Sequence, residues 1–335
     1  MSSVKLLNID RGGHMPKYRQ IIRSVERAIA EGRLRRHDRL PSVNQICLAY
    51  SLSRDTVLLA YEELKKRGIV YSILGKGYFV KTMEVWMEQR VFLLFDELNA
   101  FKEEIYNSFL VTIDKQIRVD IYFHHFNLDM FKKLVAEING NYAKYIIMPT
   151  NMAGTAPIIK TLPAQDVIIL DQKNPELGGY PSVHQHFAQD MYDGLLKGRS
   201  LIDKYRQLVL LYPGNKEPIG MVEGFLAFCR EHSLPHEVRE QFRNDDILPG
   251  TVFIIPNDRD LVNVIEQAQS QQLTIGRDVG IISYNDIPLK KVVEKGITTI
   301  STDFAAMGRT LADMVMHGRN DQVKNPSDLI IRQTL

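Results

Sequence analysis

The residues whose chemistry is easiest to interpret lie in two short segments, Ser53-Arg54-Asp55-Thr56 and Gly75-Lys76-Gly77. An arginine in the first turn of an exposed helix can donate two hydrogen bonds to guanine O6 and N7, worth about 1–3 kcal/mol in base discrimination. A threonine hydroxyl and the amides of a helix N-terminus suit a phosphate oxygen. Two glycines would let a turn approach the minor groove, where the lysine adds positive charge. These residue types favour contact with DNA.

Each of these residues also has a simpler interpretation. Arg54 could form a surface ion pair along its helix, and the glycines could be ordinary hairpin residues. The charge distribution favours DNA. Residues 1–81 carry 16 Lys and Arg against 7 Asp and Glu, a net charge of +9, whereas the remainder carries 26 against 33, a net charge of −7. A basic first quarter on an acidic remainder indicates a polyanion-binding head on a body with another task.

The elements that must position these residues follow from the apolar spacing. A helix is predicted from Pro16 to the stop at Gly32. Ser42 should cap a second helix that buries Val43, Ile46, Cys47 and Tyr50, and Ser53 a third that buries Val57, Ala60, Tyr61 and Leu64. Strands at 69–71 and 78–80 flank the glycine turn. Together these predict a winged helix-turn-helix.

The order and spacing of these residues resemble the GntR family of bacterial regulators over roughly residues 15–81. The resemblance rests on Pro16-Lys17-Tyr18, Leu40-Pro41-Ser42, Ser53 to Val57, Glu63-Leu64, and Gly75 to Val80. It implies a dimeric winged-helix protein that binds double-stranded operator DNA. The DNA contacts would then come from Ser42, Asn44, Ser53, Arg54, Asp55, Thr56, Gly75, Lys76 and Gly77. The family often has a basic residue at the position of Asn44, so that contact should differ here.

After residue 90 the pattern changes to short apolar runs that alternate with helical segments. Strands are predicted at 91–95, 118–123, 145–148, 167–170, 207–211, 252–255 and 279–282, and helices at 102–115, 130–139, 190–197, 220–231, 261–269 and 305–317. Apolar strands separated by helices indicate parallel sheets covered on both faces. Their number predicts an α/β body of two doubly wound lobes. Ligands of such sheets bind beyond the carboxyl ends of the strands, here between the lobes.

The body also resembles the effector domains of the lactose- and galactose-repressor group, which share the periplasmic-binding-protein fold. The resemblance rests on Asp190 with Gly194, on Pro256-Asn257-Asp258, and above all on Asp278 to Leu289, Thr298 to Asp303 and Met307-Gly308-Arg309. It implies ligand contacts at Asn257, Asn285 and Asp171, and an aromatic-type contact at His186. His124 or its neighbour His125 would face the same space. The relatives often have an arginine where Met221 stands and an aspartate where Asn285 stands, which indicates a neutral sugar held differently.

These ligand residues fit sugar chemistry, because amides and carboxylates bind hydroxyl groups and an apolar ring such as Phe95 can lie under the sugar. The alternative is that Asn257 and Asn285 cap helices and that the His184–His186 segment is a surface loop. A metal site at His124-His125 and His184-x-His186 lacks further identifiable ligands. The sequence indicates no cofactor and no catalytic nucleophile with its base.

The sequence therefore predicts a DNA-binding domain at 1–81, a linker at 82–89 that contains Trp86, and a two-lobed sugar-binding domain at 90–335. Cys47 and Cys229 are expected to be reduced core residues, and no apolar run is long enough to cross a membrane, so we expect a cytoplasmic protein. The expected function is a homodimeric regulator, a repressor of carbohydrate-utilisation genes controlled by a small sugar. The alternative is a sugar-processing enzyme that carries a DNA-binding head.

Overall fold

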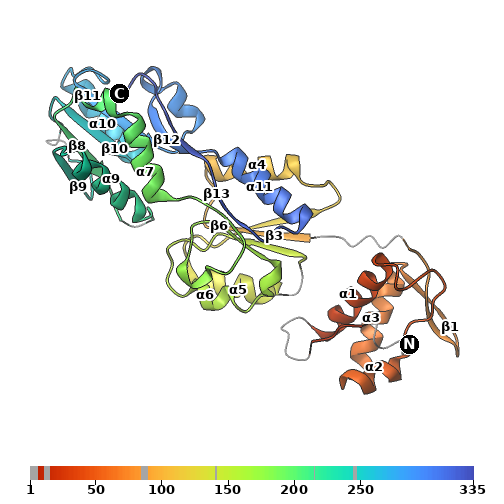
Figure 1. Cartoon of the computed structure of the whole chain (residues 1–335). Coiled ribbons are helices and arrows are strands. Elements are labelled where there is room, and N and C mark those ends of the chain that lie inside the picture. The colour runs from red at the N-terminus through yellow and green to blue at the C-terminus, as the bar shows by residue number, and fades with distance from the viewer. Residues whose placement is uncertain (1–6, 11–15, 84–89, 140–141, 215, 244–246) are drawn as a thin grey trace.

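The structure is a computed structural model of the whole chain and describes residues 7–10, 16–83, 90–139, 142–214, 216–243 and 247–335. Trp86 and most of the predicted linker lie outside these ranges. A small helical head is followed by two α/β lobes (Figure 1). The head contacts the first lobe through a hydrogen bond from the Arg23 guanidinium to the Tyr142 carbonyl oxygen.

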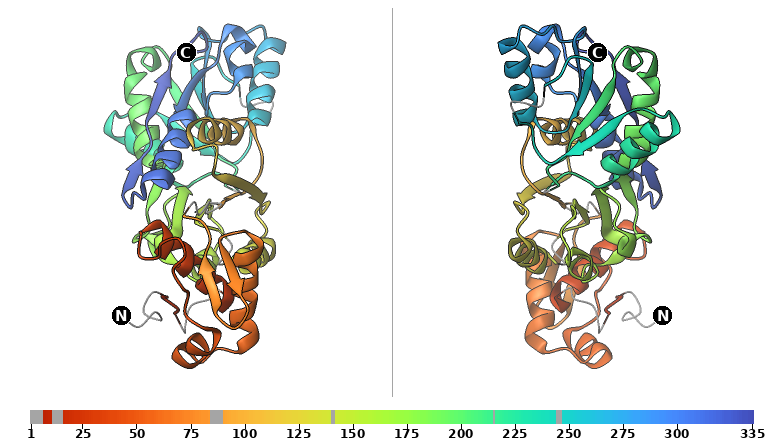
Figure 2. Two further views of the ribbon diagram at one scale, coloured as in Figure 1. Left: turned by 90° about the vertical axis from the view of Figure 1, so that its right-hand side faces the viewer. Right: turned by 90° about the vertical axis from the view of Figure 1, so that its left-hand side faces the viewer.

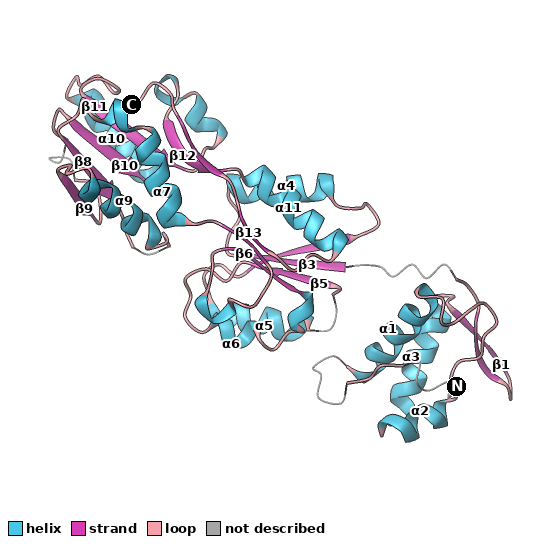
Figure 3. Ribbon diagram, viewed as in Figure 1, coloured by secondary structure: helices cyan, strands magenta, loops and turns pink. Residues whose placement is uncertain are grey.

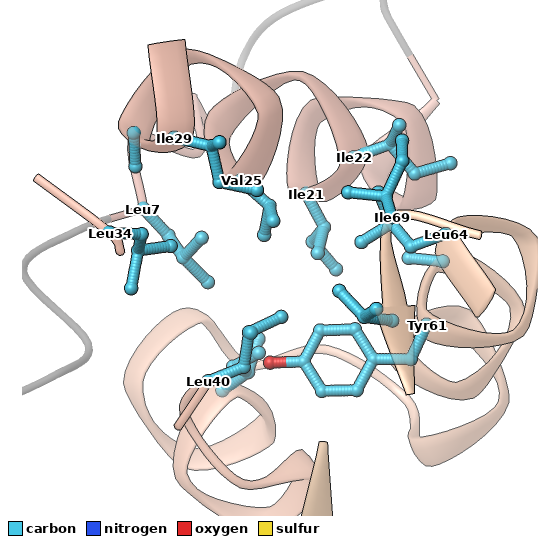
Figure 4. Packing of buried hydrophobic residues seen from close by; sticks show 14 of the residues in the cluster. Leu7, Ile21, Ile22, Val25, Ile29, Leu34, Leu40, Tyr61, Leu64 and Ile69 are labelled. Carbon is cyan, nitrogen blue, oxygen red and sulfur yellow. The ribbon is translucent and has the colours of Figure 1, made fainter. Parts of the chain in front are cut away.

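The head is the predicted winged helix-turn-helix. It consists of α1 (Lys17–Ala30), α2 (Val43–Tyr50), α3 (Arg54–Lys66), β1 (Val70–Ile73) and β2 (Gly77–Val80). The inner face of α3 is buried as predicted, with Val57, Ala60, Tyr61 and Leu64 all inaccessible. Their side chains meet those of α1 in one core, with the Tyr61 hydroxyl donating to the Pro41 carbonyl oxygen (Figure 4). On α2 only Ile46 is fully buried, because this short helix contacts the core along a narrow stripe.

A third extended segment, residues 37–40, pairs with the wing, and the sequence does not predict it. The connector before α2 pairs with β2, since His37 N–H donates to Val80 O, Val80 N–H to Asp38 O, and Leu40 N–H to Tyr78 O. Arg39 lies opposite Phe79 in an antiparallel bridge. The basic connector is therefore part of a small antiparallel sheet, and its backbone is fixed against the wing.

The first lobe is a six-stranded sheet in the order β13-β7-β6-β5-β3-β4, with every neighbouring pair parallel. Its strands are β3 (Arg90–Phe95), β4 (Arg118–Phe123), β5 (Lys144–Ile147), β6 (Val167–Asp171), β7 (Ser182–His184) and β13 (Gln322–Lys324). Its helices are α4 (Ala100–Thr112), α5 (Leu128–Ile138), α6 (Thr155–Ile159) and α11 (Phe304–His317). Helices α4 and α11 cover one face and α5 and α6 the other (Figure 3).

The second lobe is a six-stranded sheet in the order β14-β12-β11-β10-β8-β9, in which only β14 runs antiparallel. Its strands are β8 (Gln207–Leu211), β9 (His236–Arg239), β10 (Thr251–Ile255), β11 (Val279–Tyr284), β12 (Thr298–Thr302) and β14 (Ser327–Ile330). Its helices are α7 (Phe187–Lys197), α8 (Arg199–Ile202), α9 (Gly220–Glu231) and α10 (Asp258–Ser270). The two predicted lobes are confirmed.

The chain passes between the lobes three times, after β7, after β12 and after β13 (Figure 2). Asn325 joins these crossings: its N–H donates to the His184 carbonyl oxygen and its Nδ2 to the Asp303 carbonyl oxygen. Asp303 N–H in turn donates to the Pro326 carbonyl oxygen. Three hydrogen-bonded crossings form a narrow hinge, across which the lobes can move as units.

Two glycines of the body permit close helix packing. A Cβ at Gly308 of α11 would lie 2.3 Å from the Ile105 carbonyl oxygen of α4, and one at Gly224 of α9 would lie 2.1 Å from the Ala188 carbonyl oxygen of α7. Both neighbours are backbone atoms and cannot move aside cheaply. These positions therefore require glycine because of contact distance.

Candidate DNA-binding surface and effector site

The N-termini of α2 and α3 are fixed by their serines, as predicted. Ser42 forms a capping box with Gln45: its hydroxyl accepts from the Gln45 N–H, and the Gln45 side chain accepts from the Ser42 N–H. Ser53 accepts from the Thr56 N–H at 3.2 Å, and the two hydroxyls lie 2.8 Å apart. The side chains of Ser42, Ser53 and Thr56 are thus engaged in holding the turn.

The side chains left facing solvent at these termini are Asn44, Arg54 and Asp55. None of them forms an ion pair within the described part of the chain, so the alternative of a surface ion pair for Arg54 is not what the structure shows. Cations of the same helix further from the turn are paired, Arg67 with Glu26 and Glu63 and Lys65 with Glu62. The helix N-terminus therefore presents a guanidinium that is free to bind an external acceptor.

The wing is held against α3 by its aromatic residues. The Tyr78 hydroxyl donates to Glu62 Oε1 at 2.9 Å, and the rings of Tyr61 and Tyr78 lie 4.7 Å apart. Gly75 and Gly77 have φ angles of +74° and +105°, a backbone region that favours glycine. The turn between them exposes Lys76. The lysine thus has a defined position relative to the recognition helix.

In the first lobe, His124 follows β4 and is completely buried. Its Nε2 lies 3.2 Å from the Met148 carbonyl oxygen, and because a carbonyl only accepts, the ring proton lies on Nε2. Burial lowers the pKa of His124, so the ring is neutral at pH 7. Nδ1 is then an acceptor, and it has no partner among the described residues.

Asp171 ends β6 with a left-handed backbone (φ +76°) and is 9% exposed. Burial raises the pKa of its carboxyl to about 6, against the hydrogen bond from Gln185 and the nearby Lys102 cation. Lys102 itself forms a buried ion pair with Asp96, just after β3. The same two charges also affect the pKa of His124, which Asp96 raises and Lys102 lowers. The strand ends of β3, β4 and β6 therefore form one polar cluster in the first lobe.

Gln185, which sequence reasoning missed, connects this cluster to the second lobe. Its Nε2 donates to the Asp171 carboxylate at 2.5 Å, and its Oε1 accepts from the Thr302 hydroxyl at 2.6 Å. Gln185 precedes α7 and Thr302 ends β12, so the bonds span two of the three crossings. No local pattern marks Gln185, because its partners lie 14 and 117 residues away.

Asn285 follows β11 in the second lobe. It adopts a left-handed backbone (φ +61°), and its Oδ1 is buried without a hydrogen-bond partner among the described residues. Lys290, also missed, holds this loop: its ammonium donates to the carbonyl oxygens of Tyr284 and Asn285 and pairs with Asp258 at 2.9 Å. Burial lowers the pKa of Lys290, which Asp258 opposes. Lys290 is therefore a positioning residue for the loops after β10 and β11.

Two other candidates act as helix caps. Asn257 caps α10, with Oδ1 accepting from the Asp260 N–H at 2.8 Å and Nδ2 donating to the Asp260 carboxylate at 2.7 Å. His186 caps α7: its Nδ1 accepts from the Gln189 N–H, and its own N–H donates to Asp190. For Asn257 this cap is the alternative expected from the sequence. For the His184–His186 segment the expected alternative, a surface loop, is wrong, because His184 ends the buried strand β7 and His186 caps α7. Both capping residues keep further hydrogen-bonding capacity.

Phe95 does not lie under a ligand site. Its ring is fully buried in the core of the first lobe, 6.3 Å from the ring of Phe123. As the last residue of β3, it alternates to the face that α4 and α11 cover. The expectation that its ring would support a sugar is therefore corrected.

An open pocket of about 600 Å³ lies beside the expected site rather than in it. Residues of α4, Arg309 of α11 and the 286–291 segment line this pocket, and the six candidate ligand residues do not. It thus marks a surface where both lobes meet, on the α4 side of Asn285.

The described residues contain no group of three or more His, Cys, Asp or Glu side chains arranged to hold a metal ion. No helix among them is long and apolar enough to span a bilayer. Cys47 and Cys229 are both free thiols, as predicted.

Comparison with known proteins agrees with this two-part construction. Residues 17–80 match the profile of the bacterial regulatory proteins of the gntR family, and residues 203–335 match the periplasmic binding protein-like domain. Among solved structures, the trehalose repressor of Escherichia coli is 14% identical, covers 72% of this chain and 100% of its own, and has a TM-score of 0.60. A LacI family regulator of Enterococcus faecium with bound ribose is 19% identical, covers 73% and 98%, and also has a TM-score of 0.60.

The fold and the two matched domains define a transcriptional regulator with a GntR-family DNA-binding head and a periplasmic-binding-protein-like effector body. The family matched by the head is one of transcriptional regulators, not of enzymes. Over 96% of both chains this protein is similar to the arabinose metabolism transcriptional repressor of Geobacillus stearothermophilus, at 23% identity. Its head is similar to that of the mannosyl-D-glycerate transport/metabolism system repressor of Escherichia coli, 36% identical over 28% of this chain and 36% of the other.

Proposed function

We propose that this protein represses genes of carbohydrate use and that a small sugar, bound between its two lobes, controls its hold on DNA. As a DNA-binding regulator it acts in the cytoplasm. Its relative from Geobacillus, similar along the whole chain, is a repressor of arabinose metabolism. That relationship makes a pentose the first effector to examine.

The observation that carries the proposal is the set of polar groups without partners at facing strand ends. His124 Nδ1 in the first lobe and Asn285 Oδ1 in the second are buried acceptors with no donor among the described residues. The Asp171 carboxylate adds acceptor capacity beyond its single bond from Gln185. A buried acceptor without a donor costs about 1–3 kcal/mol, which a ligand rich in hydroxyl groups would recover.

Backbone geometry supports the same location. Asp171 and Asn285 both have positive φ angles, at the carboxyl ends of β6 and β11. Strained residues of this kind persist where the surrounding structure holds them and cluster at ligand sites. Here Gln185 holds Asp171 and Lys290 holds Asn285. A sugar that bonds both residues would bridge the lobes and favour their closure about the hinge.

We expect closure of the lobes to change DNA affinity because the protein would bind its operator as a homodimer. Two heads on one operator must match two half-sites, so a change in their separation changes affinity. The effector shifts this equilibrium only by the difference between its affinities for the two states. In each head, Arg54 and Asp55 with Asn44 would read the major groove, and Thr56 would contact a phosphate oxygen. Gly75, Lys76 and Gly77 would contact the minor groove.

Exposed apolar side chains support a dimer surface on the α4 side. Val111 is 88% exposed, and Leu289 and Val292 are 68% and 72% exposed. Val111, Pro288 and Lys291 line the same pocket, and Leu289 and Val292 are the sequence neighbours of Pro288 and Lys291. Leu289→Asp with Val292→Asp should yield monomers in sedimentation velocity. The control Val238→Asp lies on β9, at the opposite edge of the sheet, and should leave the dimer intact.

The proposal is tested by a thermal-shift screen of monosaccharides and their phosphates, followed by DNA-binding titrations. A true effector at about a hundred times its dissociation constant adds about 2.7 kcal/mol of stability. We expect one sugar, arabinose or a related pentose first, both to raise Tm and to change affinity for a duplex selected from a random pool. A screen in which no sugar does either contradicts the proposal.

A further inference from the structure

The connector strand of the wing places one arginine that no motif singled out. Arg39 lies opposite Phe79, which in turn pairs with Tyr71 across the ribbon. Side chains directly opposite one another share a face of a sheet, and so do residues two apart in a strand. Arg39, Phe79, Tyr71 and Gly77 therefore lie on one face, whereas Tyr78 points to α3 on the other.

The Arg39 side chain follows this outer face toward the turn. A Cβ built on Gly77 would lie 3.5 Å from Arg39 Nε and 3.6 Å from Nη2. The guanidinium is thus beside Gly77, one residue from the exposed Lys76. Since Leu40 N–H is bonded to Tyr78 O, the backbone that carries Arg39 is fixed relative to the turn.

The guanidinium of Arg39 has no acidic partner in the part of the chain that the structure describes. Arg39 is exposed and forms no ion pair with any described residue, although acidic groups are near in sequence. The neighbouring Asp38 carboxylate instead accepts from the Arg35 N–H at 2.7 Å. By contrast, Arg33 on the same connector pairs with Glu31 at 2.6 Å. Both arginines are therefore exposed, but among the described residues only Arg33 is paired with a carboxylate.

We propose that Arg39 is a further DNA contact, in which its guanidinium donates to a phosphate oxygen of the strand that borders the groove entered by the 75–77 turn. This inference rests on the proposed DNA-binding function and deepens it. The three cations then have separate tasks: Arg54 reads bases, Lys76 enters the groove, and Arg39 binds the backbone. A backbone contact contributes affinity equally for all sequences and releases about one counterion.

The test uses the full chain and fluorescence anisotropy over a series of salt concentrations. Two duplexes are compared, one selected from a random pool by the wild-type protein and one scrambled. Arg39→Gln keeps a side chain along Gly77 without the charge, and Arg39→Lys restores the charge. Arg33→Ala is the matched control, and Arg54→Ala reports base reading independently. Far-UV circular dichroism and thermal unfolding check that each variant folds.

We expect Arg39→Gln to weaken binding to both duplexes by the same factor and to reduce the slope of log K against log salt by about 1. Arg39→Lys should restore the slope, and Arg33→Ala should leave it unchanged. An unaltered slope in Arg39→Gln overturns the inference if Arg54→Ala still abolishes the preference for the selected duplex. If Arg54→Ala also has no effect, the DNA-binding assignment of the head itself fails.

Discussion

The head and the body present their unpartnered groups to different surroundings. In the head these groups are exposed cations, Arg39, Arg54 and Lys76, around a small core. In the body they include two buried neutral acceptors that follow strand ends, His124 Nδ1 in the first lobe and Asn285 Oδ1 in the second. Exposed charge suits a polyanion bound through long-range attraction, whereas buried acceptors suit a small neutral ligand that displaces water. The difference teaches that one chain holds two recognition chemistries, one in the head and one in the body.

The largest effect is expected from a substitution of Lys290, which positions the candidate ligand site of the body. Because Lys290 is not part of the head, this substitution separates the two regions. Lys290→Met keeps the aliphatic stem but removes the bonds to the carbonyl oxygens of Tyr284 and Asn285. We expect a loss of about 3 kcal/mol in unfolding free energy and a lost response to sugar. Binding to the selected duplex without sugar should persist. If sugar affinity survives in calorimetry, Lys290 does not position the site.

Arg54→Ala tests the head in the same way. The variant should lose about 2 kcal/mol of preference for the selected duplex over a scrambled one, because a two-pronged contact to a base is removed. Since Arg54 is exposed and unpaired, Tm should not change. Competition anisotropy with both duplexes measures the preference. An unaltered ratio, with Arg33→Ala as the control, would contradict base reading by Arg54.

The pH dependence of the unfolding free energy tests the buried carboxyl of Asp171 in the body. Burial raises its pKa to about 6 in the fold, above about 3.9 in an unfolded chain, so ionisation destabilises the fold at pH above 6. Asp171→Asn should raise unfolding free energy by about 1–2 kcal/mol at pH 8, and the gain should disappear as the pH falls toward 4.

Urea titrations of both proteins across this pH range measure the difference. A gain that stays constant with pH would show that ionisation of Asp171 is not its cause. The same variant should bind sugar more weakly, because an amide has fewer acceptor sites than a carboxylate. Stability and ligand affinity then change in opposite directions, as expected of a functional buried charge.

The smallest expected effect concerns how the wing is held. Tyr78→Phe removes the bond to Glu62 but retains the ring contact with Tyr61. The loss should be about 0.5–1 kcal/mol in stability. Affinity for both duplexes should fall slightly and equally, because Lys76 becomes less well positioned. A change in preference between duplexes would instead place Tyr78 in base reading.

The head was predictable from sequence almost entirely, because its signals are local. Ser42 and Ser53 cap helices within four residues of their partners, and glycines mark the turn. The connector strand was not predictable: residues 37–40 lack an apolar alternation, and their partner lies about forty residues on. No sequence pattern therefore sets Arg39 apart from the other arginines of this segment.

The lobes were predictable from their apolar runs, but the short strands β7, β9, β13 and β14 were not, since three or four partly polar residues carry no periodic signal. The candidate effector residues stay a prediction, and most of their contacts could not be predicted from the sequence. On sequence alone Asn257 fits either a ligand contact or a helix cap, and His186 fits either a ligand contact or a surface loop; the caps that both residues form depend on the folded helix ends. Gln185 and Lys290 act through folded contacts that no local motif encodes.

The central claim is that a sugar held by the body controls the head. Its most direct test is a titration of the selected duplex with and without the sugar found by the thermal screen, for the wild type and for Asn285→Ala. The wild type should change DNA affinity with sugar, and Asn285→Ala should bind DNA equally well but no longer respond. A variant that responds like the wild type, with unchanged sugar affinity in calorimetry, would contradict the claim that the buried acceptor at Asn285 binds the effector.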